Sequence, residues 1–175
     1  MHIFLIGYMG VGKSTVAGVL SEKLGLPCAE MDAMIVEQQG MPITEIFEKY
    51  GEDYFRDVES KLLMDLKEKD SMIISCGGGV VLRPENAGYM RESGKVVWLT
   101  AEPETVFERV KDSKERPLLN QNMNVDFIRG MMEQRQKKYE AAADLVIATD
   151  DKSADLITEE ISLQLAAVKQ QTGKN

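Results

Sequence analysis

Eight residues near the N-terminus, Gly7–Ser14, have the types and the spacing that bind a nucleotide phosphate. They match G-x-x-x-x-G-K-[ST], the phosphate-binding loop. Its glycines let the backbone turn tightly and present N–H groups to phosphate oxygens, and the positive N-terminal end of the next helix points at the same oxygens. Lys13 would bring a full charge to the β- and γ-phosphates, and the Ser14 hydroxyl would bind Mg²⁺. The loop predicts a nucleotide site, but it does not separate a kinase from a GTPase switch or a motor.

Two carboxylates, Glu30 and Asp32, stand at the end of the second apolar run. Ligands of open α/β sheets bind at the carboxyl ends of the strands, and period-two spacing predicts that both side chains leave the strand on one side. One carboxylate would lie near Mg²⁺, and the other would hold an acceptor hydroxyl and take its proton. Asp32 has an equally good structural interpretation as a helix N-cap.

Arg56 and Glu59 are three residues apart in a predicted helix and are therefore neighbours on one face. Glu59 would fix the guanidinium so that it offers two N–H groups to a carboxylate. For this pair alone, an ordinary exposed ion pair is the favoured interpretation.

The glycines Gly77–Gly79 end the third apolar run, where they suit close approach of a ligand to the backbone. A tight turn is the alternative interpretation.

The segment Asp112–Asn124 is polar and aperiodic, which predicts a mobile loop between two helices, about residues 112–124. Its arginine, Arg116, would close over the transferring phosphate.

The helix that follows carries Arg135 and Tyr139 one turn apart, and Arg135 would be a second carboxylate anchor. A solvated arginine is the structural alternative.

Short apolar runs alternate with helical segments along the chain. Most runs are apolar continuously, as strands buried on both faces are; they are Ile3–Ile6, Cys28–Met31, Met72–Ser75, Val96–Leu99 and Leu145–Ala148. Helices are predicted to begin at Lys13 and after Ile43, Glu52, Pro84, Pro103, Val125 and Ala154. Strand and helix in alternation predict an α/β fold, with a five-stranded parallel sheet in a three-layer αβα arrangement. We expect one domain over residues 1–175, with a frayed tail at about 170–175.

The composition excludes several classes of protein. A net charge of −8 argues against nucleic-acid binding, and it requires a local basic pocket for any anionic substrate. The sequence has no run long enough to span a membrane and no signal peptide, so we expect a cytoplasmic protein. Cys28 and Cys76 are interpreted as small buried residues and not as a disulfide. The lone histidine, His2, cannot build a metal site and is expected to be exposed.

Together these elements resemble the shikimate kinase family over nearly the whole chain. The shared features are the phosphate loop, the acidic pair, G-E-x-x-F-R-x-x-E, G-G-G, R-P-L-L, and an arginine and a tyrosine four apart. The resemblance implies a P-loop NTPase fold of the nucleoside-monophosphate-kinase type. It implies transfer of a phosphate from Mg·ATP to the 3-hydroxyl of shikimate, in aromatic amino acid biosynthesis. Shikimate is the expected partner, and we expect a monomer.

The resemblance also implies a role for each matching residue. Lys13, Asp32 and Arg116 would be catalytic, with Asp32 activating the attacking hydroxyl and Ser14 on the metal. The nucleotide would be bound by Gly10, Val11, Gly12, Lys13, Ser14, Thr15, Arg109, Arg116 and Lys152. Shikimate would be bound by Asp32, Arg56, Gly77, Gly78, Gly79 and Arg135. Arg109 would lie along adenine, and the stretch 150–153 would pass the other side of the base.

One position departs from the family pattern. The family usually has aspartate at both acidic positions, whereas the first is Glu30 here. Its extra methylene moves the carboxylate further along, from where it would still reach a magnesium-bound water. The alternative function is a kinase of another small hydroxylated carboxylate such as gluconate. A GTP-dependent switch would need an N-K-x-D motif, which does not occur, and a catalytically dead regulator is disfavoured by the intact Lys13 and Asp32.

Overall fold

The computed structural model describes residues 1–111 and 124–172. Residues 112–123 and 173–175 lie outside the described part of the chain. The predictions for Arg116 and for the loop at 112–123 therefore fall on residues that the structure does not describe, and the same holds for the last three residues of the tail.

The described residues form a sheet of five parallel strands in the order β2-β3-β1-β4-β5. The strands are β1 (His2–Ile6), β2 (Cys28–Glu30), β3 (Ile73–Ser75), β4 (Gly94–Thr100) and β5 (Leu145–Ala148). In the centre, β1 pairs with both β3 and β4, so that Ile3 lies between Ile73 and Lys95. The predicted five-stranded parallel sheet is confirmed.

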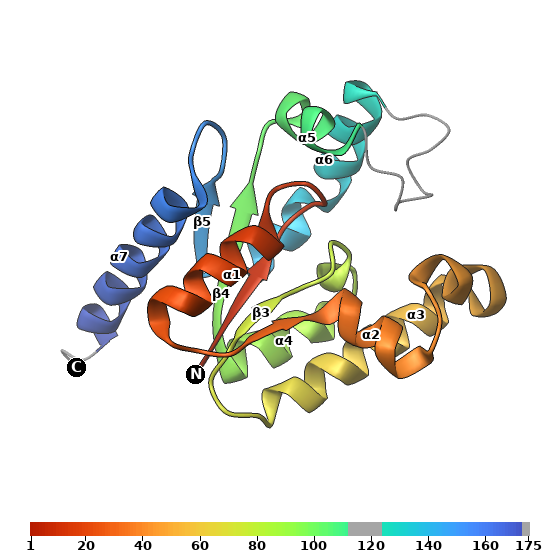
Figure 1. The fold of residues 1–175 in the computed structure, drawn as a ribbon, viewed down its shortest axis with the longest axis horizontal. Helices are drawn as coiled ribbons and strands as arrows, with labels where there is room; N and C mark the ends of the chain where they lie inside the picture. Colours follow the sequence, from red (N-terminus) through yellow and green to blue (C-terminus); the bar gives the residue numbers. More distant parts are fainter. Residues whose placement is uncertain (112–123, 173–175) are drawn as a thin grey trace.

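Helices cover both faces of this sheet (Figure 1). They are α1 (Lys13–Leu24), α2 (Met31–Gln39), α3 (Ile43–Lys67), α4 (Pro84–Ser93), α5 (Pro103–Val110), α6 (Val125–Ala142) and α7 (Ala154–Thr172), with a 3₁₀ turn η1 (Val80–Leu82). Because side chains alternate along a strand, β1 sends Ile3 and Leu5 into a core with α1 and α7, and Phe4 and Ile6 into a second core. The second core contains residues of α2, α3, α4 and α6, so the αβα layering is confirmed.

The helix boundaries follow local signals in the sequence. Helix α1 ends at Gly25, which adopts the left-handed conformation with φ 64°. Inside α3, Gly51 has the non-helical angles φ 82° and ψ 173°, which divide the helix at a kink. The two parts correspond to the helices predicted after Ile43 and after Glu52. In the parts of the chain described here, no helix is both long enough and apolar enough to cross a membrane.

Two expectations about burial were wrong. His2 is only 2% exposed, because it belongs to the central strand β1, and its ring lies 5.7 Å from that of Phe4. Cys28 is exposed, because β2 is an edge strand, whereas Cys76 is buried as expected. The pattern of apolar runs identified both strands, but it did not indicate which one lies in the middle of the sheet.

Candidate active site

The phosphate loop connects β1 to α1 and borders a cavity of about 160 Å³ at the carboxyl ends of the strands. Gly10 and Gly12 adopt positive φ angles of 77° and 99°, which other residues rarely tolerate. A Cβ on Gly10 would also come within 2.6 Å of Cγ1 of Val110. The loop conformation therefore depends on these glycines. The cavity is lined by Met9, Gly10, Gly12, Lys13, Ser14, Thr15, Glu30, Asp32, Ser75, Cys76 and Gly78.

Lys13 and Ser14 lie at the start of α1 and face this cavity. The Lys13 ammonium donates to the carbonyl oxygens of Gly7 at 2.8 Å and Tyr8 at 3.0 Å, which holds it over the loop. The Ser14 hydroxyl donates to Oε2 of Glu30 at 3.0 Å. A hydroxyl oxygen and a carboxylate oxygen thus lie side by side next to the phosphate loop.

This pair of oxygens fits a magnesium ion. Mg²⁺ prefers oxygen ligands and, in phosphate-transfer sites, is held by one or two protein groups together with phosphate oxygens and water. Across residues 1–111 and 124–172, no three or more histidine, cysteine, aspartate or glutamate side chains gather into a metal-binding group. Such a complete protein cage is not required for an ion that arrives with a nucleotide.

Asp32 reaches the cavity from a helix and not from a strand. Strand β2 ends at Glu30, and Asp32 lies in the first turn of α2. The prediction that both carboxylates leave one side of a strand was therefore wrong. The N-cap interpretation was also wrong, because the capping position is Glu30. Both side chains nevertheless line the same cavity, and Oδ1 of Asp32 lies 2.8 Å from the position that a Cβ on Gly77 would occupy.

Arg56 is held between two glutamates on α3. Its guanidinium donates to Oε2 of Glu59 at 2.8 Å and pairs with Glu52 at 3.2 Å. The Arg56 and Glu59 side chains are only 11% and 1% exposed, so the interpretation as an ordinary exposed ion pair was wrong. The guanidinium also lies directly against Gly79, whose missing side chain makes room for it.

Glu59 is the most buried carboxylate of this cluster. Burial raises its pKa, and the Arg56 charge counteracts that rise. Its Oε1 atom has no hydrogen-bond partner among residues 1–111 and 124–172, and it lies 2.8 Å from the position of a Cβ added to Gly77. A buried acceptor of this kind is costly unless a ligand or water satisfies it. The cluster therefore suits a polar ligand lying over the glycine turn.

Arg135 and Tyr139 extend from α6 to the same turn. Nη1 of Arg135 lies 3.4 Å from the Gly78 carbonyl oxygen, which also accepts a hydrogen bond from the Tyr139 hydroxyl. The Arg135 guanidinium lies 5.8 Å from the centre of the Tyr8 ring, within the range of a cation–π contact. Arg135 thus contacts both the glycine turn and the phosphate loop.

Arg109 links the phosphate loop to the segment after β5. Its guanidinium donates to the Gly10 carbonyl at 3.2 Å and to the hydroxyl and carbonyl oxygens of Thr149 at 3.1 and 3.2 Å. Lys152, by contrast, pairs with Glu160 on α7 at 2.6 Å. The Val11 side chain is buried in the core, so that its backbone alone is available to a phosphate.

Seven of the residues predicted for the site line this cavity, namely Gly10, Gly12, Lys13, Ser14, Thr15, Asp32 and Gly78. Sequence reasoning did not identify Ser75 and Cys76 as lining residues and gave the Met9 side chain no role within the phosphate loop, because apolar or small side chains carry no chemical signal. Burial raises the pKa of the Cys76 thiol, which keeps it protonated and unreactive. Thr149 was likewise missed, since its contact with Arg109 joins residues 40 positions apart.

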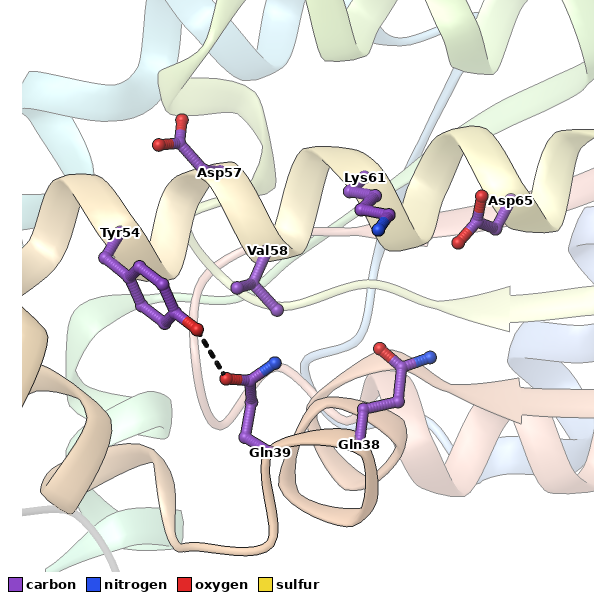
Figure 2. A pocket seen from close by; sticks show the side chains of 7 residues that line it. All are labelled: Gln38, Gln39, Tyr54, Asp57, Val58, Lys61 and Asp65. Carbon is purple, nitrogen blue, oxygen red and sulfur yellow. Dashed lines mark hydrogen bonds between the residues drawn. The ribbon is translucent and has the colours of Figure 1, made fainter.

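A second hollow lies between α2 and α3, and Figure 2 shows its side chains. The Tyr54 hydroxyl donates to Oε1 of Gln39 at 2.8 Å across it. It is lined by Gln38, Gln39, Tyr54, Asp57, Val58, Lys61 and Asp65. None of the predicted site residues belongs to this set, so this hollow is not the candidate active site.

Comparison with known proteins identifies the family. The model of the shikimate kinase family matches residues 9–166. A shikimate kinase from Dehalococcoides mccartyi is 41% identical over 172 residues, covering 98% of this chain and 97% of the relative. The chain belongs to the shikimate kinase family.

Solved structures of this family share the fold. The shikimate kinase of Acinetobacter baumannii, solved in complex with shikimate, has a TM-score of 0.88 and 33% identity, and the match covers 96% of this chain and 93% of that one. A gluconokinase from Sinorhizobium meliloti matches with a TM-score of 0.58 and 17% identity, covering 99% of this chain and 97% of that one. This second likeness shows a common fold and nothing about the substrate.

Proposed function

We propose that this shikimate kinase transfers the γ-phosphate of ATP to the 3-hydroxyl of shikimate in the cavity described above. The observation that carries the proposal is that Lys13 and Asp32 line one cavity, beside a glycine turn that Arg56 and Arg135 flank. The lysine that would bind the phosphates, the candidate base and the two arginines that would bind a carboxylate are thus adjacent. This arrangement suits a kinase whose acceptor is a small carboxylate.

On the donor side, the phosphate loop would bind ATP. Backbone N–H groups of Gly10–Thr15 and the N-terminus of α1 are available to the phosphates, and Lys13 supplies a full positive charge. Ser14 and Glu30 would hold Mg²⁺, which neutralises phosphate charge when it is bound. Glu30 is well placed for this role although the family usually has aspartate here, because its Oε2 atom lies 3.0 Å from the Ser14 hydroxyl.

Near the base, Arg109 would lie beside adenine, since it already bridges the Gly10 carbonyl and Thr149. For Lys152 to contact the nucleotide, it would have to exchange its ion pair with Glu160. The proposal for Lys152 therefore stands on the family resemblance, and that for Arg109 stands on its contacts as well.

On the acceptor side, Arg56 and Arg135 would bind the shikimate carboxylate. Two guanidinium groups near one backbone turn provide the paired N–H donors that a carboxylate accepts. They also create a locally basic pocket in a protein whose net charge is −8. Gly77–Gly79 would let the ring lie against the backbone; a side chain on Gly77 would collide with Asp32 and Glu59, and one on Gly79 would collide with Arg56.

The chemistry would be an in-line phosphoryl transfer. The 3-hydroxyl oxygen of shikimate forms a bond to the γ-phosphorus while the bond between that phosphorus and the β,γ-bridging oxygen breaks, releasing ADP. The hydroxyl proton passes to the Asp32 carboxylate. Lys13 stabilises the negative charge that develops on the phosphate oxygens.

The test is an ADP-release assay run with shikimate, with gluconate and without an acceptor. We expect ADP release and shikimate 3-phosphate with shikimate, little turnover with gluconate, and little hydrolysis without an acceptor. Strong turnover of gluconate but not of shikimate would overturn the proposal.

We further propose that the enzyme acts as a monomer. The described residues assigned to the two substrates gather at one edge of the sheet of a single chain. Light scattering coupled to gel filtration should give a mass near 19.6 kDa. A dimer mass that persists on dilution to assay concentrations would contradict this.

A further inference from the structure

Tyr139 is an almost fully buried tyrosine whose hydroxyl makes a long-range contact. The residue is 2% exposed, and its hydroxyl donates to the Gly78 carbonyl, 61 positions earlier in the chain. Burial raises the pKa of this phenol to about 12, so that the hydroxyl stays a neutral donor at any ordinary pH. The hydroxyl therefore keeps the proton that it donates to this carbonyl across the pH range of an ordinary assay.

The carbonyl that Tyr139 contacts is the one in the glycine turn that bonds to a different element. The Gly77 carbonyl accepts from Val80 N at 3.1 Å, and the Gly79 carbonyl accepts from Leu82 N at 2.9 Å. These two bonds are local and form the 3₁₀ turn. The Gly78 carbonyl instead accepts from α6, so it ties the turn to a different element. A glycine turn has no side chains to pack, so bonds of this kind must fix its position.

Tyr139 itself is held in place by stacking. Its ring lies 5.6 Å from that of Trp98 on β4, with an angle of 16° between the two planes. Trp98 is the only tryptophan in the sequence. The ring that carries the hydroxyl thus extends from α6 and packs against the sheet through Trp98. Arg135, one helical turn away, lies against the same carbonyl at 3.4 Å.

We propose that Tyr139 is a positioning residue for the acceptor. By fixing the Gly78 carbonyl, its hydroxyl holds the glycine turn and Arg135 in the arrangement that binds a ring carboxylate. This inference rests on the proposed function, since it assigns a role at the same acceptor site. Tyr139 acts through these groups and does not itself touch the reacting atoms.

The test replaces Tyr139 by phenylalanine, which removes the hydroxyl and keeps the stacked ring. Loss of one net hydrogen bond corresponds to about a three- to tenfold change in an equilibrium constant. We expect the KM for shikimate to rise by about that factor, while the KM for ATP stays within about twofold. Titration calorimetry with shikimate and no nucleotide should show the same weakening.

Two further variants separate positioning from folding. Tyr89→Phe removes a phenol hydroxyl from α4, which packs against the same core, and should leave both KM values unchanged. In an Arg135→Ala background, Tyr139→Phe should have a smaller effect on shikimate binding than in the wild type, because the two residues act through one carbonyl.

The outcomes are distinguishable. If Tyr139→Phe binds shikimate as tightly as the wild type, the positioning role is wrong and the proposed function stands. If both KM values rise equally and the melting temperature falls, the hydroxyl serves the fold, and the positioning role is again wrong. If the wild type neither binds nor phosphorylates shikimate, the proposed function fails together with this inference.

Discussion

Replacing Gly79 by alanine offers a sharp test of the acceptor site, because the atoms nearest to the added methyl group belong to Arg56. The three atoms nearest to an added Cβ all belong to the Arg56 guanidinium group, and the Cζ atom would lie 2.5 Å away. Ordinary contact between carbon atoms begins at about 3.5 Å, so the guanidinium must move by about 1 Å. The backbone itself accommodates alanine, since Gly79 has a φ of −102°. The protein should fold normally with a displaced arginine.

The magnitude follows from what the displaced guanidinium would lose. A hydrogen bond to a charged group contributes about 1.5–3 kcal/mol, and about 1.4 kcal/mol corresponds to a factor of ten. If the shifted Arg56 no longer meets the shikimate carboxylate, the KM for shikimate should rise roughly ten- to a hundredfold. The KM for ATP should change by less than about twofold, because Arg56 is not among the residues proposed for the nucleotide.

The assay is steady-state ADP release with each substrate varied in turn. Gly88→Ala is the matched control, because a Cβ there would meet no atom within 4 Å and Gly88 lies inside α4. It should leave both KM values unchanged and should stabilise the helix slightly. In an Arg56→Ala background, Gly79→Ala should change the shikimate KM by less than about twofold, since the colliding group is gone.

Either of two results would refute this reasoning. A Gly79→Ala enzyme with the shikimate KM of Gly88→Ala would show that the position of Arg56 does not matter for the acceptor. A large additional effect of Gly79→Ala in the Arg56→Ala background would show that the methyl group disturbs something other than this arginine.

Three further predictions concern the donor site and the buried tyrosine. Lys13→Ala should lower kcat/KM by well over tenfold, a loss of more than about 1.4 kcal/mol of transition-state stabilisation, and a smaller decrease in steady-state assays would contradict the role of this lysine. Glu30→Ala should raise the Mg²⁺ concentration needed for half-maximal ATP binding in calorimetric titrations, and an unchanged Mg²⁺ dependence would remove Glu30 from the metal site. Because burial raises the pKa of Tyr139 to about 12, the unfolded chain loses this proton first as the pH rises above about 10. The free energy of unfolding of the wild type should therefore fall between about pH 10 and 12 relative to that of Tyr139→Phe, and parallel curves in denaturant titrations would contradict the raised pKa.

The fold and the donor half of the site were predictable from the sequence because their signals are local. Short, mostly apolar runs marked all five strands, and Gly25 and Pro103 marked helix termini at or near their observed positions. The phosphate loop is a contiguous motif, so that its glycines, Lys13 and Ser14 are brought together by a single turn of the backbone. The geometry of such a contiguous motif depends little on how the surrounding helices and strands pack.

The acceptor half was predictable only in part. Order and spacing of the motifs resembled the shikimate kinase family, but the residues alone left Asp32 as a possible cap and Arg56 as a surface ion pair. The structure decided against both, because α2 begins before Asp32 and because Glu59 is 1% exposed. Burial depends on which elements pack over a side chain, and that information is not contained in the spacing of one helix.

The sequence by itself therefore determined the elements of this protein, their order and the phosphate loop. The tertiary structure decided which side chains meet: Arg56 against Gly79, and Tyr139 with Arg135 on the Gly78 carbonyl. These partners are separated by 23 to 61 positions in the chain. No local propensity links residues so far apart, and their contacts arise only when strand pairing and the burial of two apolar cores bring α3 and α6 to the same end of the sheet.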